Sequence, residues 1–399
     1  MEYRKFSTFI EKTQYGYTAD ETSPETGDAK YLRITDIVPY FVDKDRVPYC
    51  IISDEKKAQY LVNENDLLIA RTGATTGYNL VVPKGFSNYV FASYLVRYYY
   101  RQNELFPQYL KHVLKSQQYY GFVNNYISGS AQPGMNPKAF GRFEVPYVSY
   151  EMQKRIAQIL STYDNLIEVN NKRIKVLEQM AENLYKEWFV RFRFPGHETA
   201  EFENGIPKGW EYCTVESLSA VLQRGISPDY DDDGELTVIS QKCIRQNIMD
   251  IREARKQNKE FKTELNIEDG DTVICSTGTG TLGRVGQVYG EYSNTTFDSH
   301  VTLIRATETV GKHYLYWTLK EMQSWFMNMG IGSTNQQELY RGTIKNAKAL
   351  KPNADLMERF DQIIELIHKN IIMLINKQEN LTRQRDLLLP RLMSGKLEV

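Results

Sequence analysis

The stretch DLLIARTG at residues 66–73 returns about 205 residues later as DTVICSTG at residues 271–278. Three further motifs recur in the same order at nearly the same shift: FAS at 91–93 with FDS at 297–299, YL at 109–110 with YL at 314–315, and GS at 129–130 with GS at 332–333. Such ordered self-similarity predicts an internal repeat of one domain type. A length of 399 residues fits two such domains with connecting segments.

Each copy has short runs rich in Val, Ile, Tyr and Thr, interrupted by Gly, Pro and Asn, and these predict strands. The expected strands cover residues 31–37, 67–70, 89–99, 273–275 and 301–304. Helical spacing follows at residues 107–119 and 312–326, so each copy is expected to be an α+β domain. The predicted domains are a first globular domain at 1–148, a spacer helix at 149–195, a second globular domain at 196–352, and a second spacer helix with a tail at 353–399.

Both spacers carry apolar residues at alternating steps of four and three, which is the seam of a coiled coil. The predicted seam consists of Ile156, Leu160, Tyr163, Ile167, Asn170, Ile174, Leu177, Leu184 and Trp188 in the first spacer, and Phe360, Ile364, Ile367, Ile371, Leu374, Leu381 and Leu388 in the second. The polar Asn170 fits the use of one buried amide to fix register. We expect the two helices to pair antiparallel, with packing of each helix on its own domain as the alternative.

Composition excludes several classes of protein. Lys and Arg total 49 against 50 Asp and Glu, so the net charge of −1 rules out a uniformly basic nucleic-acid coat. No apolar run approaches the roughly 20 residues that span a bilayer, and we expect a cytoplasmic protein. The four cysteines are far apart, which favours reduced, structural thiols over a metal site. The 28 tyrosines suit a binding surface, although many rings will be core.

Catalytic motifs are incomplete. The GTGTLG stretch at 278–283 satisfies GxGxxG, but residues 284–289 read as a strand where a dinucleotide site needs a helix, so we interpret it as a turn between strands. The acidic DYDDDG stretch at 229–234 lacks the glutamate that closes a calcium loop. A metal nuclease using Asp229 and Glu260 is a weaker possibility, and the five histidines are scattered. The pattern favours a binding protein over an enzyme, with no metal and no cofactor on this chain.

A duplicated domain on paired helices has approximate two-fold symmetry, and so does duplex DNA. Dimeric DNA readers place their half-sites about 34 Å apart, and the first seam predicts a helix of roughly 48 Å. Two reading domains could therefore be held at such a spacing within one chain. Because the two copies differ in sequence, their half-sites would differ as well.

The sequence resembles the specificity (DNA-recognition) subunit of type I restriction-modification systems. The motifs that carry this resemblance are GS at 129–130 with Gln132, Phe140, Phe143 and VP at 145–146; QKRIAQIL at 153–160 with Asp164; LYKEWF at 184–189; IPKGW at 206–210; and LLPRLMSGKL at 388–397. Two departures stand out. Residues 3–9 lack the Pro-x-Gly-Trp opening, and MERF at 357–360 replaces the QKRI of the first spacer.

The resemblance implies a non-catalytic subunit that reads a bipartite, asymmetric site in double-stranded DNA, one half with each domain. It also implies two methyltransferase subunits as partners, which use S-adenosylmethionine to methylate adenine, and restriction subunits that use ATP and Mg²⁺. These cofactors would bind the partners. The alternative function is a duplicated scaffold or adaptor that grips proteins, which the near-neutral charge permits.

Candidate DNA contacts are the cationic, amide and hydroxyl side chains of the glycine-rich turns, the polar loops before each spacer, and the flanks of two strands, because such groups pair with phosphates and base edges. They are Lys30, Arg33, Arg71, Thr72, Thr75, Thr76, Asn79, Ser130, Gln132 and Asn136 in the first copy, and Lys242, Arg245, Ser276, Thr277, Thr279, Thr281, Arg284, Ser333, Asn335 and Gln336 in the second. For the turns, a plain hairpin without a DNA contact is the competing interpretation.

Replacing Arg71 tests this assignment. If Arg71 contacts a base, Arg71→Ala should weaken reading of one half-site by about 1–3 kcal/mol and leave the other half unaffected. Competition binding against DNA that carries base changes in each half would measure the effect. Unchanged binding to every sequence would remove Arg71 from the interface.

Overall fold

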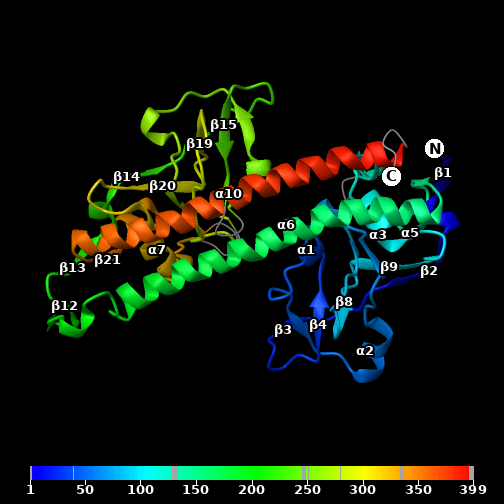
Figure 1. Cartoon of the computed structure of the whole chain (residues 1–399), viewed down its shortest axis with the longest axis horizontal. Helices are drawn as coiled ribbons and strands as arrows, with labels where there is room; N and C mark the ends of the chain where they lie inside the picture. The colour runs from blue at the N-terminus through cyan, green and yellow to red at the C-terminus, as the bar shows by residue number, and fades with distance from the viewer. Residues whose placement is uncertain are drawn as a thin grey trace. The chain divides into compact units, whose positions relative to one another are not determined.

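The computed structural model describes residues 2–38, 40–127, 134–244, 249, 251–278, 280–332 and 337–394, with the backbone alone at 252. The chain divides into two compact units (Figure 1). The first unit comprises Met1–Asn170 with Lys377–Val399, and the second comprises Asn171–Asn376. No helix in the described part of the chain is long and apolar enough to cross a membrane.

The first unit is built around a four-stranded antiparallel sheet with the order β2-β9-β6-β7. Its strands are β2 (Ile10–Tyr15), β9 (Leu95–Tyr100), β6 (Leu67–Ala70) and β7 (Asn79–Val81). Successive side chains of a strand point to opposite faces. Leu67 and Ile69 of β6 therefore join one hydrophobic core, and Leu68 and Ala70 join another.

A second sheet of the first unit has the order β3-β5-β4-β8, in which β4 and β8 run parallel. Its strands are β3 (Glu21–Thr22), β5 (Tyr49–Cys50), β4 (Ala29–Leu32) and β8 (Tyr89–Phe91). The strand expected over 31–37 is shorter than predicted, because helix α1 (Ile34–Ile37) starts directly after it. The Asp36 carboxylate accepts hydrogen bonds from the backbone and guanidinium of Arg33, and this local cap outweighs the β propensity of the segment.

The remaining elements of the first unit surround these sheets. They are β1 (Glu2–Lys5), which pairs with β10 (Glu144–Tyr147), the 3₁₀ turns η1 (Phe6–Thr8) and η2 (Gly73–Thr75), and the helices α2 (Asp54–Tyr60), α3 (Pro107–Val113), α4 (Gln117–Ile127) and α5 (Pro137–Phe140). The helical segment expected at 107–119 is thus two helices, α3 and the start of α4.

The second unit has a four-stranded antiparallel sheet with the order β14-β20-β17-β18. Its strands are β14 (Ser219–Arg224), β20 (Val301–Ala306), β17 (Thr272–Cys275) and β18 (Val285–Gln287). A three-stranded sheet follows the order β16-β15-β19, from β16 (Arg255–Gln257), β15 (Leu236–Ile239) and β19 (Thr295–Phe297), and β15 and β19 run parallel. Strand β17 also serves two cores: Ile274 joins one, and Val273 and Cys275 join the other.

Short strands and helices complete the second unit. They are the hairpin β11 (Phe202–Glu203) and β12 (Ile206–Pro207), the pair β13 (Glu211–Thr214) and β21 (Lys348–Lys351), the helices α7 (Lys312–Glu321), α8 (Gln323–Asn328) and α9 (Arg341–Asn346), and the 3₁₀ turns η4 (His197–Thr199), η5 (Val215–Leu218), η6 (Gln241–Cys243), η7 (Ile251–Glu253) and η8 (Thr263–Leu265).

Two long helices contribute to both units (Figure 1). Helix α6 (Tyr150–Tyr185) continues into one π-helical turn, η3 (Lys186–Val190), and α10 (Ala354–Met393) contains Pro390. The first helix therefore ends at Val190, before the predicted end of the first spacer helix at residue 195. In the second helix the missing N–H of Pro390 removes one hydrogen bond in the last turns.

Within each unit, residues of α6 pack with residues of α10. In the first unit Ile156 and Leu160 share a core with Leu389 and Leu392, and in the second Ile174 shares one with Ile371. All sixteen predicted seam residues are buried or half-buried. The buried ones are Ile156, Leu160, Ile167, Asn170, Ile174, Trp188, Phe360, Ile364, Ile371 and Leu374, and the half-buried ones are Tyr163, Leu177, Leu184, Ile367, Leu381 and Leu388.

The family-like motifs at the end of α6 form one aromatic cluster in the second unit. The Phe189 ring lies 5.9 Å from that of Trp210 and 5.1 Å from that of Phe360. Trp210 belongs to the IPKGW motif. The first spacer motif is equally constrained, because Gln153 is fully buried and its amide bonds the backbone of Phe106, Glu104 and Val148.

A buried aspartate precedes the central strand of each main sheet. Asp66 accepts hydrogen bonds from the Asn63 backbone and from the Arg97 guanidinium, both at 2.9 Å. Asp271 accepts from the Glu268 backbone at 2.8 Å and from Arg305 at 2.7 Å. Since a buried charge is tolerated only when it is paired, each aspartate depends on its arginine.

Each unit also depends on one glycine that leaves no room for a side chain. A Cβ on Gly16 would lie 2.1 Å from the Ala92 carbonyl oxygen, and one on Gly225 would lie 2.0 Å from that of Phe297. Both glycines follow the first strand of the main sheet and face the FAS or FDS motif. Backbone contact this close joins the two sheets of each unit.

Substitution of Gly16 should therefore be costly. Gly16→Ala is expected to lower the free energy of unfolding by about 3 kcal/mol, because the backbone of β8 would have to move. The matched control is Gly121→Ala in α4, where a Cβ would meet nothing within 4 Å. Alanine there should be neutral or stabilise by about 0.5–1 kcal/mol. Urea unfolding measures both, and equal stabilities would contradict the close approach.

Candidate nucleic-acid interface

In the first unit the glycine-rich loop between β6 and β7 is closed by backbone hydrogen bonds. The Gly77 N–H donates to Ala70 O at 2.8 Å, and the Met135 N–H donates to Arg71 O at 2.9 Å. The Thr76 hydroxyl donates to Gly73 O at 2.7 Å. The loop is thus held in one conformation at the end of a buried strand.

Arg71 is half-buried at the start of this loop, directly after β6. Its guanidinium carbon is 5.0 Å from the centre of the Tyr15 ring, and its Nε donates to Ser93 O at 3.4 Å. Tyr15 and Tyr94 are 50% and 57% exposed. A cation beside an exposed aromatic ring suits nucleic acid, because rings stack on bases and cations pair with phosphates or guanine. Neither tyrosine was among the predicted contacts, and the abundance of tyrosine was the only signal for them.

Other predicted contacts of the first unit use their polar groups internally. Asn79 is 1% exposed and donates to Leu114 O at 2.7 Å, while the Asn136 side chain caps helix α5. Lys30 donates to Lys44 O, and Arg33 pairs with Asp36 and Glu21, which raises the pKa of its guanidinium. Thr72 and Thr75 are half-buried on the loop. Arg71 and these two threonines remain the best placed.

The second unit repeats the hydrogen-bonding pattern of this loop between β17 and β18. The Gly283 N–H donates to Cys275 O, and the Leu339 N–H donates to Ser276 O, both at 2.8 Å. The interpretation of GTGTLG as a turn between strands is confirmed, because β18 pairs antiparallel with β17 and no helix follows. The acidic stretch at 229–234 is a turn that Asn258 bonds through Asp231.

Side chains on the second loop divide into internal and exposed groups. Ser276 is fully buried against the Thr302 hydroxyl, Thr281 bonds Thr277 O, and Arg284 donates to Ile244 O and Gly280 O. The Thr277 hydroxyl lies 2.6 Å from His300 Nδ1 at the surface, and Lys242 is exposed on η6.

Two charged residues beside the second loop were not predicted. Arg224, at the end of β14, pairs with Glu338 at 2.6 Å. Glu338 forms an isolated bridge with Thr277 of the loop. Only the tertiary fold brings residues so distant in sequence together, so no local signal could have found them.

Several predicted contacts lie outside the described residues: Ser130, Gln132, Arg245, Thr279, Ser333, Asn335 and Gln336. Among the residues that are described, no group of three or more His, Cys, Asp or Glu side chains could hold a metal ion.

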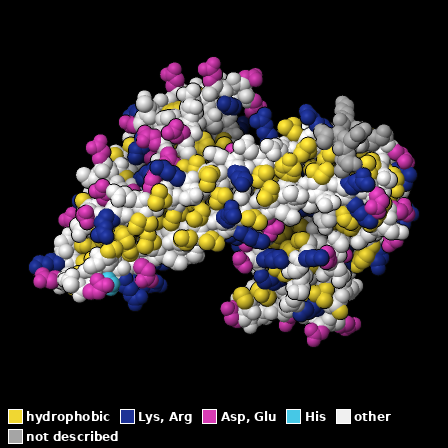
Figure 2. All heavy atoms as spheres, in the orientation of Figure 1, with side chains coloured by type: hydrophobic (Ala, Val, Ile, Leu, Met, Phe, Trp, Pro, Cys, Tyr) yellow, Lys and Arg dark blue, Asp and Glu magenta, His cyan; other side chains and the backbone are white. Residues whose placement is uncertain are grey.

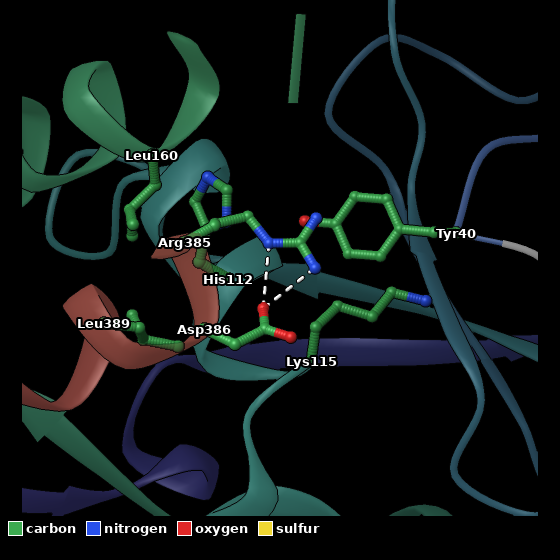
Figure 3. A pocket seen from close by; sticks show the side chains of 7 residues that line it. All are labelled: Tyr40, His112, Lys115, Leu160, Arg385, Asp386 and Leu389. Carbon is green, nitrogen blue, oxygen red and sulfur yellow. Dashed lines mark hydrogen bonds and ion pairs between the residues drawn. The ribbon is translucent and has the colours of Figure 1, made fainter. Parts of the chain in front are cut away.

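A buried charge cluster in the first unit anchors the loop after α1 to the long helices. The Asp164 carboxylate accepts from Lys111 at 2.6 Å, from Arg385 at 2.9 Å and from the Tyr40 hydroxyl at 3.0 Å. Figure 3 shows the Arg385 guanidinium beside the Tyr40 ring, 4.1 Å from its centre, and its ion pair with Asp386. Asp164, a residue of the family-like motif, thus holds together three separate segments of the unit.

Titration in this cluster is strongly perturbed. Burial, together with the charges of Lys111 and Arg385, lowers the pKa of His112 to about 3, although Asp164 acts in the opposite direction. Burial likewise lowers the pKa of Lys115, which donates to Asn79 O, to about 8. Burial alone would raise the pKa of Asp164, but its cationic neighbours outweigh that effect and lower it.

Both long helices also expose apolar side chains, visible over them in Figure 2. The exposed residues are Leu166, Val169, Val176 and Met180 on α6, and Ile363, Leu366, Met373 and Leu387 on α10. Solvent-facing apolar stripes on helices are typical of contact surfaces for other proteins.

Comparison with known proteins gives one consistent result. Residues 16–179 match the family model of the type I restriction modification DNA specificity domain. The MjaIX and MjaVIII specificity subunits of type I restriction enzymes from Methanocaldococcus jannaschii are 26% and 22% identical. The first match covers 73% of this chain and 69% of the relative, and the second covers 93% of each. The structure of a type I restriction-modification S subunit from M. genitalium superposes with a TM-score of 0.51 at 15% identity, over 98% of this chain and 95% of the other, which is a likeness of fold.

The pKa of His112 predicts a specific acid sensitivity of the first unit. Its folded pKa lies below the value of about 6.5 for an unfolded histidine, so its contribution is present above pH 6.5 and is lost as pH falls toward 3. Between pH 6.5 and 5 the stability advantage of the native chain over His112→Gln should shrink by about 2 kcal/mol. Denaturant unfolding of both proteins at several pH values measures this, with pH 8 as the reference. Parallel pH profiles would show that His112 takes up its proton in the folded state.

Proposed function

We propose that the chain is a specificity subunit of a type I restriction-modification system, a non-catalytic subunit that recognises DNA, and that its two units read the two halves of a bipartite, asymmetric DNA site. One observation carries this proposal. Both units place a loop closed by matching hydrogen bonds at the end of a buried strand, and the side chains on the two loops differ. Two different half-sites require loops that are placed alike in the two units but carry different side chains.

We assign the base and phosphate contacts to the outward groups of these loops. In the first unit they are Arg71, Thr72 and Thr75 with the exposed Tyr15 and Tyr94. In the second they are Thr277, His300 and Lys242 with the Arg224–Glu338 pair. Thr76, Asn79, Ser276 and Arg284 support the loops, because their polar groups bond within the units.

The long helices are the proposed scaffold. Each contributes residues to both units, and we propose that they pair as the coiled coil predicted from the seam and separate the reading domains. The exposed apolar side chains of α6 and α10 would bind two methyltransferase subunits, and restriction subunits would join through those. S-adenosylmethionine, ATP and Mg²⁺ would bind these partners.

The decisive experiment is to copurify the chain with its co-encoded methyltransferase and to map adenine methylation across a genome at base resolution. The expected result is one gapped, asymmetric motif with a methylated adenine in each half, which appears only when this chain is present. Arg71→Ala should relax the sequence preference in one half of the motif alone, and the control variant Gly121→Ala should leave the motif unchanged.

Two results would overturn the proposal. A continuous motif would exclude reading by two domains, and methylation independent of this chain would favour the adaptor function. The salt dependence of DNA affinity further separates the DNA-reading function from the adaptor function. A DNA reader loses affinity steeply as salt rises, since phosphate contacts release counterions, whereas an adaptor shows no such dependence.

A further inference from the structure

The two units differ in charge at two positions that are equivalent in their folds and lie beside the loops. Tyr15 is the last residue of β2 and Arg224 is the last residue of β14, the first strands of the two main sheets. Gly134 bridges Thr72 in the first unit, and Glu338 bridges Thr277 in the second. An arginine and a glutamate therefore occur together in one unit and are absent together from the other.

The Arg224–Glu338 pair is held in position beside the second loop. Arg224 Nη1 lies 2.6 Å from Glu338 Oε1, and Nη2 donates to Leu339 O at 3.3 Å. The backbone of Glu338 exchanges two hydrogen bonds with Ile331, at 2.9 and 3.0 Å. The Arg224 and Glu338 side chains are 27% and 36% exposed, so both are accessible to a ligand.

The Arg224–Glu338 ion pair contributes little to the stability of the fold. A partly exposed ion pair contributes about 0–1 kcal/mol, and Arg224 Nε is buried without a hydrogen-bond partner among the described residues. Arginine donates two hydrogen bonds to O6 and N7 of guanine, and a glutamate accepts one from N4 of cytosine. The two side chains thus match the two bases of a single G·C pair.

We propose that Arg224 and Glu338 are specificity-determining residues of the second unit and read one G·C base pair. Arg224 donates to guanine, Glu338 accepts from the cytosine amino group, and without DNA the two side chains bond each other. Glu338 also disfavours a base that offers only acceptors there, because two acceptors repel. This inference rests on the proposed function and adds the chemistry of one half-site.

The test is selection of bound duplexes from a pool with both halves randomised, using the full-length chain with its methyltransferase. Native chain, Arg224→Ala, Glu338→Gln and the double variant are compared. The matched control is Lys208→Ala, which breaks an exposed ion pair with Glu201 in the same unit. The native chain should enrich G·C at one position of one half. Arg224→Ala should lower that preference about 10- to 100-fold, and Glu338→Gln should lower it at the same position.

Other outcomes have distinct meanings. A uniform loss of affinity with a shallower salt dependence would make Arg224 a phosphate contact, and unchanged preferences would make the pair purely structural; either overturns the inference. If Arg224→Ala lowers the melting temperature, the base preference of the nearly isosteric variant Glu338→Gln alone decides whether the pair reads DNA. A native chain that enriches no sequence would overturn the proposed function and this inference with it, whereas a gapped motif without G·C at the affected position overturns only the inference.

Discussion

The structure depends on the burial of one short strand in each unit. Strands β6 and β17 have a hydrophobic core on both faces, so all of their side chains are buried. A shift of either strand by one residue would move each side chain to the opposite face and into the wrong core. Asp66 and Asp271 fix where these strands begin through buried pairing with arginine. With the strand fixed, the loop that follows it has a defined starting point.

Much of this fold follows from sequence, because its signals are local and periodic. The repeated DLLIARTG and DTVICSTG stretches are the central strands, and the four-three spacing marks residues that are all buried or half-buried. The prediction failed where short-range hydrogen bonds competed, as at Asp36, whose cap starts a helix in place of a strand. The end of the first spacer helix, predicted at residue 195, was also misplaced, because α6 passes into a π-helical turn that ends at Val190.

The candidate site was harder to predict for a physical reason. Composition marks a side chain as polar, but only packing decides whether that polarity faces solvent. Asn79 and Arg71 are both polar residues flanking one loop, yet Asn79 bonds a carbonyl inside the unit and Arg71 lies beside an exposed ring. Arg224 and Glu338 lie 114 residues apart and meet through the tertiary fold, which no single-sequence pattern encodes.

The glycine contacts at Gly16 and Gly225 have a consequence for how such a protein can evolve. They join the two sheets of each unit through backbone atoms alone, without using any side chain of the loops. Mutations on the loop surface therefore leave this joint intact, and substitutions there need not be compensated in the core. If each unit reads one half-site as proposed, a lineage can acquire a new DNA preference by exchanging a few exposed residues in one unit while the other unit keeps its ancestral preference.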